Sequence, residues 1–446
     1  MSGINARPTN CRVLSGSLKT SLQLKNNYFI KLIKRIIYMT AFLSRRRLLQ
    51  SSLIAAGSGV LAACGAPQAP TPTPTKKPNT GSRPTVNPNI ANPTQSQPIV
   101  RHVQASSQNT MRLFASSGFA EDPSRIQTGL DRLFGAGFSI TNHQSAYRRF
   151  QRFAGSDADR TNDFLEMLNG RAPTPKVLMG VRGGYGAARI LPNIDWASLA
   201  AKMRESGTLL FGFSDVTAIQ MALLAQGNMP SFAGPMLYSE FAKPVPDSYT
   251  MDSFIENSTK NQTTVFVSEF QSMPVRNMDG VLWGGNLSVI ASLAGTPYMP
   301  KVNGGILFLE DVSEQPYRIE RMLNTLLLSG VLKQQQAIVL GNFRMGNIRD
   351  TYDSSYNLTA VAQNISRAAR IPVYTGFPFG HIAQKTTFPL GAQASLRSTG
   401  GGYSITFSGY PTLNANALNL AALKPIQQFD FIGNSDINFN NLDSEF

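Results

Sequence analysis

The chain has 446 residues, and its 41 Lys and Arg against 26 Asp and Glu give a formal charge of +15. Such an excess is typical of proteins that bind nucleic acid or an anionic membrane. However, residues 1–63 hold ten basic residues and no acidic one, so the remainder carries only +5. The charge therefore belongs mainly to the N-terminal segment, and we expect no nucleic-acid partner.

Other totals exclude further classes of protein. With 42% hydrophobic and 15% charged residues, the chain is neither disordered nor fibrous. It contains no run of about 18 apolar residues, which excludes a polytopic membrane protein. The two cysteines, Cys11 and Cys64, are too few for a disulfide framework or a Cys-based zinc site. We expect no metal and no cofactor.

Residues 1–63 resemble an export signal that ends at a lipid-attachment site. The arginines at 45–47 precede a weakly apolar stretch at 48–62, as in a twin-arginine signal. Leu-Ala-Ala-Cys, ending at Cys64, resembles a bacterial lipobox, in which the cysteine thiol is acylated. The alternative is a chance run of small residues before an ordinary buried cysteine. The long stretch before Met39 indicates that translation starts at Met39.

Residues 64–98 are rich in Pro, Thr and Asn and follow the lipobox directly. Such a segment has almost no large apolar side chains to bury, so it stays extended. It is typical of a tether that holds a domain away from a membrane. The two segments together predict an extracytoplasmic protein that is lipid-anchored to a bacterial membrane.

From about residue 111 the sequence alternates between short apolar runs and helical patterns. Residues 176–181 and 208–213 are expected as buried strands, each followed by a turn and a helix. Such units predict a mostly parallel sheet covered by helices. Beyond about residue 240, we expect strands at 264–270, 305–310, 337–343 and 403–408, and helices around 286–294, 316–328 and 357–370.

The fold class is therefore α/β. An N-terminal domain with a parallel sheet is followed by a smaller C-terminal domain with a mixed or antiparallel, strand-rich sheet. The expected parts are the export signal at 1–63, the tether at 64–98, the N-terminal domain at 99–240, an interdomain connection at 241–277, the C-terminal domain at 278–425 and a tail at 426–446.

Ser214 lies where an apolar run ends, and Asp215 opens the next helical pattern. A serine at a strand-to-helix turn projects into the crevice at the carboxyl end of the sheet. The N-terminus of the helix behind it offers N–H donors for an oxyanion. The structural alternative is a helix N-cap, and this segment taken alone favours the N-cap.

The loop at 182–189 follows the preceding strand and contains three glycines. Gly183 and Gly184 would let backbone amides approach a ligand closely, as a second oxyanion donor or a carboxylate cradle. A tight turn without a ligand explains the glycines equally well. Their spacing does not match a dinucleotide-binding fingerprint.

Glu310 ends an apolar run, where a carboxylate needs a partner if it is buried. The plain explanation is an ion pair with Arg318 or Arg321 on the helix that follows. Glu310 also stands between a candidate nucleophile and a candidate base in the sequence, so it could orient a histidine.

His381 lies in a loop after a short strand. A lone histidine is usually a structural residue. The chain has only two others, however: His102 lies at the edge of the tether and His143 lies in a polar stretch. His381 is therefore the best candidate for a general base. Ser214, Glu310 and His381 follow one another in the order nucleophile, acid, base.

These residues belong to a series of motifs that resembles the LD-carboxypeptidase family of serine peptidases over roughly residues 110–420. The resemblance implies an N-terminal nucleophile domain, a smaller C-terminal domain and an active site in the cleft between them. Lys385 stands where an asparagine is common. The motifs are FAGSD at 153–157, RGGYGAAR at 182–189, FGFSDVT at 211–217, GPM at 234–236, GGNL at 284–287, LEDVSEQPYR at 309–318 and GHIAQKTTFPLG at 380–391.

The resemblance implies a triad of Ser214, Glu310 and His381. Such a triad would release the C-terminal D-alanine from murein tetrapeptides through an acyl-enzyme. The family's microcin-immunity branch suggests another substrate, a peptidyl-nucleotide antibiotic. A peptide-binding lipoprotein without turnover is the third reading, and the sequence leaves a homodimer open.

The remaining site residues are assigned more loosely. Backbone N–H groups near Asp215, and those of Gly183 and Gly184, would hold the oxyanion. An exopeptidase must also bind the free carboxylate of its substrate. Arg182 or Arg318 could supply that contact, and the sequence does not choose between them.

Overall fold

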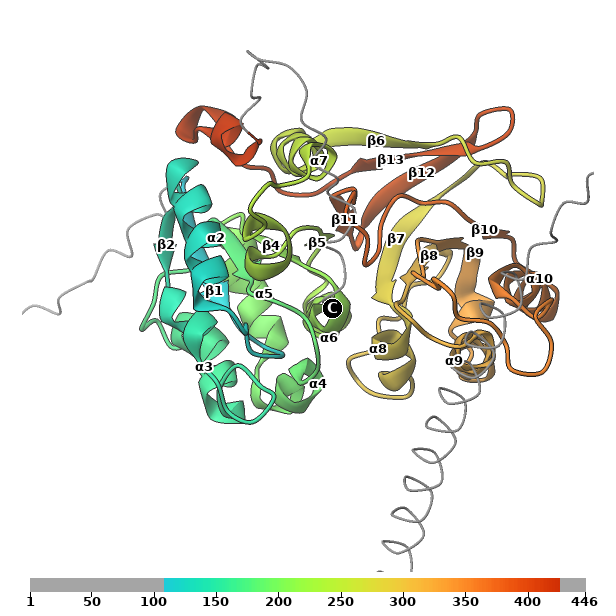
Figure 1. Ribbon diagram of the computed structural model, residues 1–446, viewed down its shortest axis with the longest axis horizontal. Helices are drawn as coiled ribbons and strands as arrows, with labels where there is room; N and C mark the ends of the chain where they lie inside the picture. The colour runs from blue at the N-terminus through green and yellow to red at the C-terminus, as the bar shows by residue number, and fades with distance from the viewer. Residues whose placement is uncertain (1–107, 426–446) are drawn as a thin grey trace, which may run out of the picture. The chain divides into compact units, whose positions relative to one another are not determined.

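A computed structural model describes residues 108–425 of the chain (Figure 1). The expected export signal, Cys64, the tether at 64–98 and the tail at 426–446 lie outside the described residues. Across residues 108–425, every helix is too short or too polar to cross a membrane.

The first sheet has six strands in the order β11-β5-β4-β3-β1-β2. Its first five strands along the chain pair in parallel, and β11 pairs antiparallel to β5 at one edge. This result confirms the expected parallel sheet. The strands are β1 (Thr110–Phe114), β2 (Ser139–Thr141), β3 (Val177–Gly180), β4 (Leu209–Gly212), β5 (Ser231–Ala233) and β11 (Phe388–Leu390).

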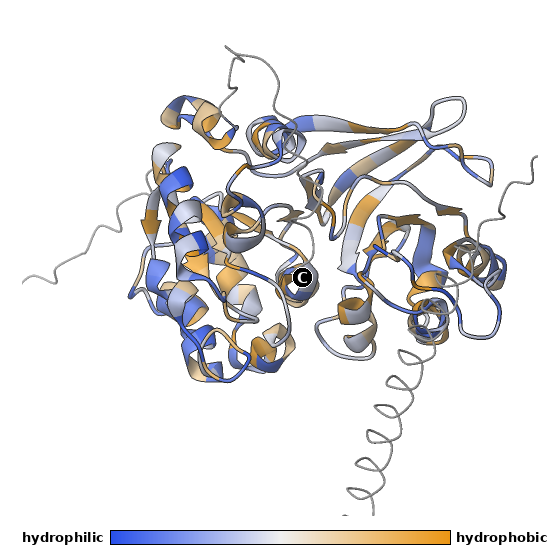
Figure 2. Cartoon of the chain, viewed as in Figure 1, coloured by the Kyte–Doolittle hydropathy of each residue, from blue (hydrophilic) through white to orange (hydrophobic). Residues whose placement is uncertain are grey.

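Strands β3 and β4 are buried along their whole length, as expected for parallel strands that are covered on both faces. Most of the covering helices are amphipathic, with hydrophobic and hydrophilic residues along their ribbons (Figure 2), whereas α6 is buried on nearly all sides. In α2, for example, Ile126, Leu130 and Leu133 share one buried face. The helices are α2 (Pro123–Gly135), α3 (Asp157–Leu168), α4 (Ala187–Ile190), α5 (Trp196–Glu205), α6 (Thr217–Gly227) and α7 (Ser248–Thr259).

The second sheet has seven strands in the order β10-β9-β8-β7-β12-β13-β6. Strands β7 to β10 pair in parallel, whereas β12, β13 and β6 continue the sheet in antiparallel pairs. The expected mixed sheet is therefore confirmed. The strands are β6 (Gln262–Val267), β7 (Met278–Asn286), β8 (Gly305–Glu310), β9 (Gln335–Leu340), β10 (Val373–Tyr374), β12 (Ala392–Ser398) and β13 (Tyr403–Ser408).

Three α-helices accompany the second sheet, and short 3-10 and π-helical turns lie along the rest of the chain. The helices are α8 (Leu287–Ser292), α9 (Pro316–Leu328) and α10 (Leu358–Ala369). The 3-10 turns are η1 (His143–Tyr147), η2 (Leu191–Asn193), η3 (Ser214–Val216), η5 (Leu332–Gln334), η6 (Ala415–Ala417) and η7 (Leu420–Leu423), and η4 (Leu237–Phe241) is a π-helical turn.

Two features of the topology were not expected from the sequence. Strand β6 overlaps the strand expected at 264–270, but it forms an edge of the second sheet, although 241–277 was expected to be a connection between the domains. The segment 388–398 contributes β11 to the first sheet and β12 to the second, with Gly391 between them. The φ of +79° at Gly391 is a left-handed conformation that glycine adopts readily. The C-terminal part of the chain therefore returns to the first sheet.

A cluster of aromatic rings packs where β11 meets the second sheet. The ring of Phe388 on β11 lies 4.9 Å from Phe308 on β8 and 5.1 Å from Phe379. The Phe379 ring in turn lies 5.7 Å from Phe213, which directly precedes Ser214. Burial of large aromatic surfaces stabilises such contacts strongly. The cluster therefore connects the loop after β4 to the loop that carries His381.

Candidate active site

Ser214 lies in a sharp turn between β4 and α6. Its φ of +60° is a left-handed conformation that residues other than glycine seldom adopt. The N-cap of η3 is Phe213 and that of α6 is Val216, and neither cap involves a side-chain hydrogen bond. The N-cap explanation of Ser214 is therefore wrong. The turn instead holds the serine at the carboxyl end of β4, in a strained conformation that is typical of functional sites.

Gly183 lies against this serine. A Cβ atom built on Gly183 would lie 2.7 Å from both Cβ and Oγ of Ser214 and 3.6 Å from the Asp215 nitrogen. No side chain fits there, so the glycine loop reaches the serine with its backbone alone. The Gly118 N–H donates to the Gly183 carbonyl at 3.0 Å and holds the loop in place. The structure thus brings Gly183, Ser214 and the Asp215 backbone together.

The side chain of Asp215 has a different task from its backbone. Its carboxylate is buried and accepts the Ala187 N–H at the start of α4 at 2.8 Å. Burial raises the pKa of Asp215, although hydrogen bonds from Ser117 and Ala187 oppose this rise. The carboxylate therefore fixes the end of the glycine loop, whereas the backbone nitrogen of Asp215 lies beside Gly183 and Ser214.

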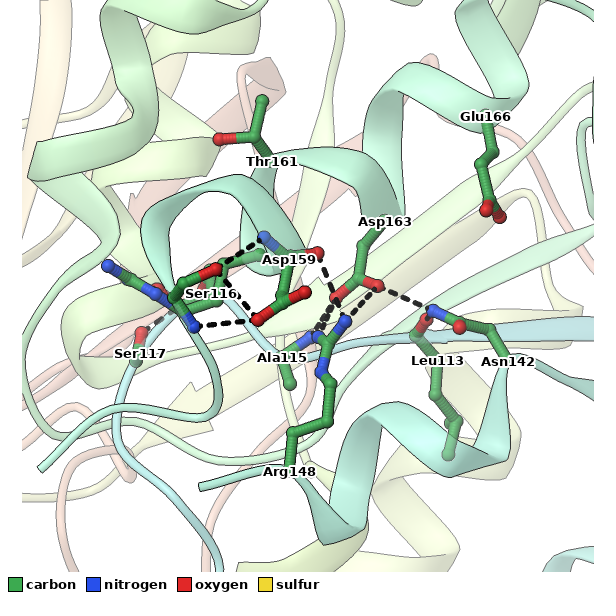
Figure 3. A network of polar contacts seen from close by, with 12 residues as sticks. Leu113, Ala115, Ser116, Ser117, Asn142, Arg148, Asp159, Thr161, Asp163 and Glu166 are labelled. Atoms are coloured by element: carbon green, nitrogen blue, oxygen red, sulfur yellow. Dashed lines mark hydrogen bonds and ion pairs between the residues drawn. The ribbon is translucent and has the colours of Figure 1, made fainter. Parts of the chain in front are cut away.

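A polar network supports the loops that surround Ser214 (Figure 3). Buried Asp163 accepts the Ala115 N–H at 2.9 Å and holds the end of β1. The fully buried Arg160 donates to the carbonyls of Ser116 and Gly186, which belong to two different loops. The two loops are thereby joined. The other donors to Asp163 are the Asn142 amide and the Arg148 guanidinium.

Glu310 ends β8 with a fully buried side chain. Its Oε2 atom lies 2.8 Å from Nδ1 of His381. The expected ion pair with a nearby arginine is wrong, because Arg318 pairs instead with Glu314, at 3.7 Å, and Arg321 contacts an aromatic ring. A carboxylate bound to Nδ1 fixes the orientation of the imidazole and leaves Nε2 for a second partner.

Asn286, at the end of β7, holds the other oxygen of Glu310. Its Nδ2 atom donates to Glu310 Oε1 and to Asp311 Oδ1, both at 3.2 Å. Its backbone N–H donates to Thr217 Oγ1 at 3.1 Å, in the first turn of the helix that follows Ser214. Asn286 thus connects Glu310 to the helix that follows Ser214. This residue belongs to the GGNL motif, but its role was not predicted from the sequence.

Phe213 contacts both His381 and a buried lysine. Its ring lies edge-on to His381 with 5.2 Å between centroids, and Lys385 Nζ lies 4.5 Å from the centre of the Phe213 ring. Among residues 108–425, no hydrogen bond joins Ser214 Oγ to His381. In free hydrolases such a bond often tightens only when substrate binds. The packing nevertheless places His381 beside the residue that precedes the serine.

A cavity of about 160 Å³ opens beside His381. Three of its lining residues are cationic and none is acidic. A larger cavity, of about 620 Å³, shares two lining residues with the smaller one, Arg344 and Ile382. The smaller cavity is lined by Phe213, Lys243, Arg344, His381, Ile382, Ala383 and Lys385.

The two arginines suggested by the sequence lie elsewhere. Arg182 donates to the Phe119 carbonyl at 2.8 Å and lies 3.4 Å from Glu121. Arg318 is half-exposed on α9. Neither residue lines the cavity beside His381.

In the described part of the chain, no group of three or more His, Cys, Asp and Glu side chains could hold a metal ion.

Comparison with known families agrees with this architecture. The model of the LD-carboxypeptidase N-terminal domain matches residues 111–234, and that of the C-terminal domain matches residues 279–396. The chain belongs to the LD-carboxypeptidase family. This LD-carboxypeptidase is accordingly a serine peptidase, and its two matched domains contain Ser214 and Glu310 with His381, respectively.

The chain is also similar to several named carboxypeptidases and to a microcin self-immunity protein. The crystal structure of muramoyltetrapeptide carboxypeptidase from Oxalobacter formigenes is 39% identical to this LD-carboxypeptidase and covers 68% of it and 100% of its own chain, with a TM-score of 0.62. Murein tetrapeptide carboxypeptidase of Pseudomonas aeruginosa is 30% identical over 59% of this chain and 84% of its own length. Microcin C7 self-immunity protein MccF of Escherichia coli is 25% identical over 67% of this chain and 93% of its own length.

Proposed function

We propose that the protein hydrolyses the L,D-peptide bond that releases the C-terminal D-alanine from murein tetrapeptides, with Ser214, His381 and Glu310 as its triad. The hydrogen bond between Glu310 and His381 Nδ1 carries this proposal, because it orients Nε2 as a base. The strained turn at Ser214 and the glycine loop against it supply the other parts of an acyl-transfer site. Relatives named for murein tetrapeptides support the substrate.

The first half of the reaction forms an ester on Ser214. As Oγ attacks the carbonyl carbon of the scissile amide, His381 Nε2 takes the hydroxyl proton. The backbone N–H of Asp215 and the amides of the glycine loop stabilise the oxyanion. His381 then gives its proton to the departing nitrogen, and the C–N bond breaks. D-Alanine leaves, and the tripeptide stays bound through its carbonyl to Ser214 Oγ.

The second half returns the enzyme to its starting state. His381 takes a proton from water as the water oxygen attacks the ester carbonyl. The same backbone donors hold the second oxyanion. When the intermediate collapses, His381 returns its proton to Ser214 Oγ, and the tripeptide leaves with a new carboxylate. The buried carboxylate of Glu310 stabilises the imidazolium in both halves.

The proposal is tested with purified muropeptides and mass spectrometry. We expect the wild-type chain to convert tetrapeptide to tripeptide with the loss of one alanine, and Ser214→Ala to leave it intact. A fluorophosphonate probe should label the wild type and not the variant, which separates loss of the nucleophile from loss of substrate binding. If folded wild-type protein is not labelled, Ser214 is not an activated nucleophile.

A second substrate class is favoured by the similarity to the microcin C7 self-immunity protein. The same triad could cleave the amide bond of a peptidyl-nucleotide antibiotic. The muropeptide assay separates the two. Labelled Ser214 with intact tetrapeptide would reject the murein substrate, and hydrolysis of an aminoacyl sulfamoyl nucleoside by that same sample would establish the second class.

We also propose that the protein is exported and lipid-anchored through Cys64, as the lipobox and the tether at 64–98 predict. Replacing Cys64 by Ser should move the protein from the membrane fraction to the soluble extracytoplasmic fraction. An unchanged distribution would reject the anchor. A homodimer stays a prediction that sedimentation equilibrium on the purified protein can decide.

A further inference from the structure

A carboxypeptidase must bind the free carboxylate of its substrate close to the scissile bond. In an α-amino acid, the nitrogen and the carboxylate carbon are attached to the same Cα atom, about 2.5 Å apart. If His381 protonates the departing nitrogen, the carboxylate must bind within a few ångströms of His381. The cavity of about 160 Å³ that His381 lines satisfies this requirement.

We infer that this cavity is the carboxylate site, in which Lys243, Arg344 and Lys385 bind the C-terminal carboxylate of the substrate. The inference rests on the proposed function and adds the residues that make the enzyme an exopeptidase. These three residues take the role that was predicted from the sequence for Arg182 or Arg318, neither of which lines the cavity.

Lys385 is held in place by a buried ion pair. Its ammonium contacts Glu240 in the π-helical turn η4, and both side chains are almost inaccessible to solvent. Glu240 also accepts the Met236 N–H at 3.0 Å and the Ser239 hydroxyl. An ammonium has three N–H donors, so the pair with Glu240 leaves donors for a second anion. The ammonium also contacts the Phe213 ring, which in turn contacts the His381 ring.

Lys243 and Arg344 come from two distant segments of the chain and line the same cavity. The Lys243 carbonyl accepts Arg132 Nη1 at 2.8 Å, so its backbone is fixed to α2 while its side chain lines the cavity. Arg344 follows β9 with a φ of +42°, and its Nη1 donates to the His381 carbonyl at 3.3 Å. A guanidinium can bind both oxygens of a carboxylate in one plane. Such a contact would orient the C-terminal residue.

The charge and size of the cavity agree with this ligand. The lining carries three cations and no acidic residue, and Glu240, which pairs with Lys385, is not part of the lining. A volume of about 160 Å³ is about five times the roughly 30 Å³ that a water molecule takes in the liquid. This space suits a small residue such as alanine.

The first experiment compares the murein tetrapeptide with the same peptide ending in D-alaninamide. The wild type should cleave the acid at least about 100-fold better in kcat/KM, because charge-assisted hydrogen bonds to the carboxylate are lost in the amide. Lys243→Gln and Arg344→Gln should each lower kcat/KM for the acid about tenfold, mainly through KM, and leave the amide unchanged. Arg318→Gln is the matched control and should behave as wild type.

Lys385 needs its own design, because its removal alone leaves a buried Glu240 without its cation. The double variant Glu240→Gln with Lys385→Asn removes both charges and places at 385 the residue that is common in the family. This variant should lose preference for the acid over the amide while it stays folded by circular dichroism. A preserved preference would remove Lys385 from the site.

The second experiment does not depend on turnover. The chain has three histidines, so the ring signals of His381 can be followed by NMR and assigned with His381→Gln. N-acetyl-D-alanine should shift the His381 signals saturably, and N-acetyl-D-alaninamide should not. The Lys243→Gln and Arg344→Gln double variant should weaken the acid at least about tenfold.

The outcomes separate the two proposals. Specific binding of the acid at His381 without cleavage of tetrapeptide keeps the carboxylate site and rejects the murein substrate. The double variant of Lys243→Gln and Arg344→Gln can also reject the site. If it cleaves tetrapeptide with an unchanged ratio of kcat/KM for acid and amide, the murein substrate is kept and the carboxylate site is rejected. Equal shifts of His381 by acid and amide also reject it.

Discussion

Gly183 and Ser214 lie so close that a Cβ atom on the glycine would come within 2.7 Å of the serine Oγ. The glycine cannot retreat easily, since its carbonyl accepts the Gly118 N–H at 3.0 Å. The serine cannot retreat either, because its φ of +60° is set by the turn between β4 and α6. The two residues therefore define together the space in which an oxyanion would form.

We expect Gly183→Ala to lower kcat by about 100-fold or more, because displacement of a catalytic group by about 1 Å costs this much. The loss should show in muropeptide cleavage and in slower fluorophosphonate labelling of Ser214. Gly135→Ala is the matched control, since a Cβ at Gly135 has no neighbour within 4 Å. Equal activity of the two variants would mean that the loop does not bound the site.

The contact between Glu310 and His381 predicts a second loss of activity. Glu310→Gln keeps the size of the side chain but removes the charge that stabilises the imidazolium, and the amide can present an N–H to Nδ1. We expect kcat to fall about 10³- to 10⁴-fold. Glu314→Gln, four residues further on and paired with Arg318, should change kcat little. A modest loss in Glu310→Gln would contradict the assigned role.

Asn286 is expected to act through Glu310 and not on the substrate. Asn286→Ala leaves Glu310 Oε1 without its donor and removes one of the two donors to Asp311 Oδ1, and an unsatisfied buried acceptor costs about 1–3 kcal/mol. We therefore expect a lower free energy of unfolding and a lower kcat, with KM nearly unchanged. Ser292→Ala, at the exposed end of α8, is the control. A raised KM with unchanged kcat would indicate a contact with substrate instead.

The sequence identified the parts of the site that motifs carry. Strand β8 and helix α9 have the expected bounds. Ser214 follows an apolar strand and Glu310 ends one, and both positions are local signals. His381 stood out because histidine is rare in the chain. These features could be predicted because an apolar run and a rare residue type can both be recognised in the sequence without knowledge of the fold.

Other parts depend on contacts between distant segments. Lys243 and Arg344 are about a hundred residues apart and meet at one cavity only through the packing of their loops. Asn286 gains its role from Asp311, which accepts its side-chain amide, and from Thr217, which accepts its backbone N–H. Strand β11 has three residues, and pairs with β5 far earlier in the chain. No local pattern indicates any of these contacts.

The buried pair of Lys385 and Glu240 should make a large difference to stability. Burial alone would raise the pKa of Glu240, but the Lys385 ammonium and the hydrogen bonds outweigh this effect and lower it. Lys385→Met should therefore cost about 3–5 kcal/mol, because it leaves an uncompensated buried carboxylate. Adding Glu240→Gln should recover most of this loss. Chemical denaturation of both variants measures the difference, and additive losses would contradict the coupling.

Asp311 gives a prediction for the dependence of stability on pH. Burial, and then the neighbouring Glu310, raise the pKa of Asp311 from 3.8 to about 6, although the N–H groups of Val312 and Ser288 oppose the rise. The folded state therefore holds its proton more tightly than the unfolded state. The resulting stabilisation is complete below about pH 4 and is lost as the pH rises through 6, by up to about 3 kcal/mol.

Asp311→Asn cannot ionise, so it should lack this loss. We expect the free energy of unfolding of Asp311→Asn relative to wild type to rise between pH 4 and pH 7 by up to about 3 kcal/mol. Asp279→Asn should show the opposite sign, since hydrogen bonds from Ser395 and Arg397 lower the pKa of Asp279. Urea denaturation at each pH measures both. If the difference between Asp311→Asn and wild type is constant over this range, folding does not raise the pKa of Asp311, and the prediction is wrong.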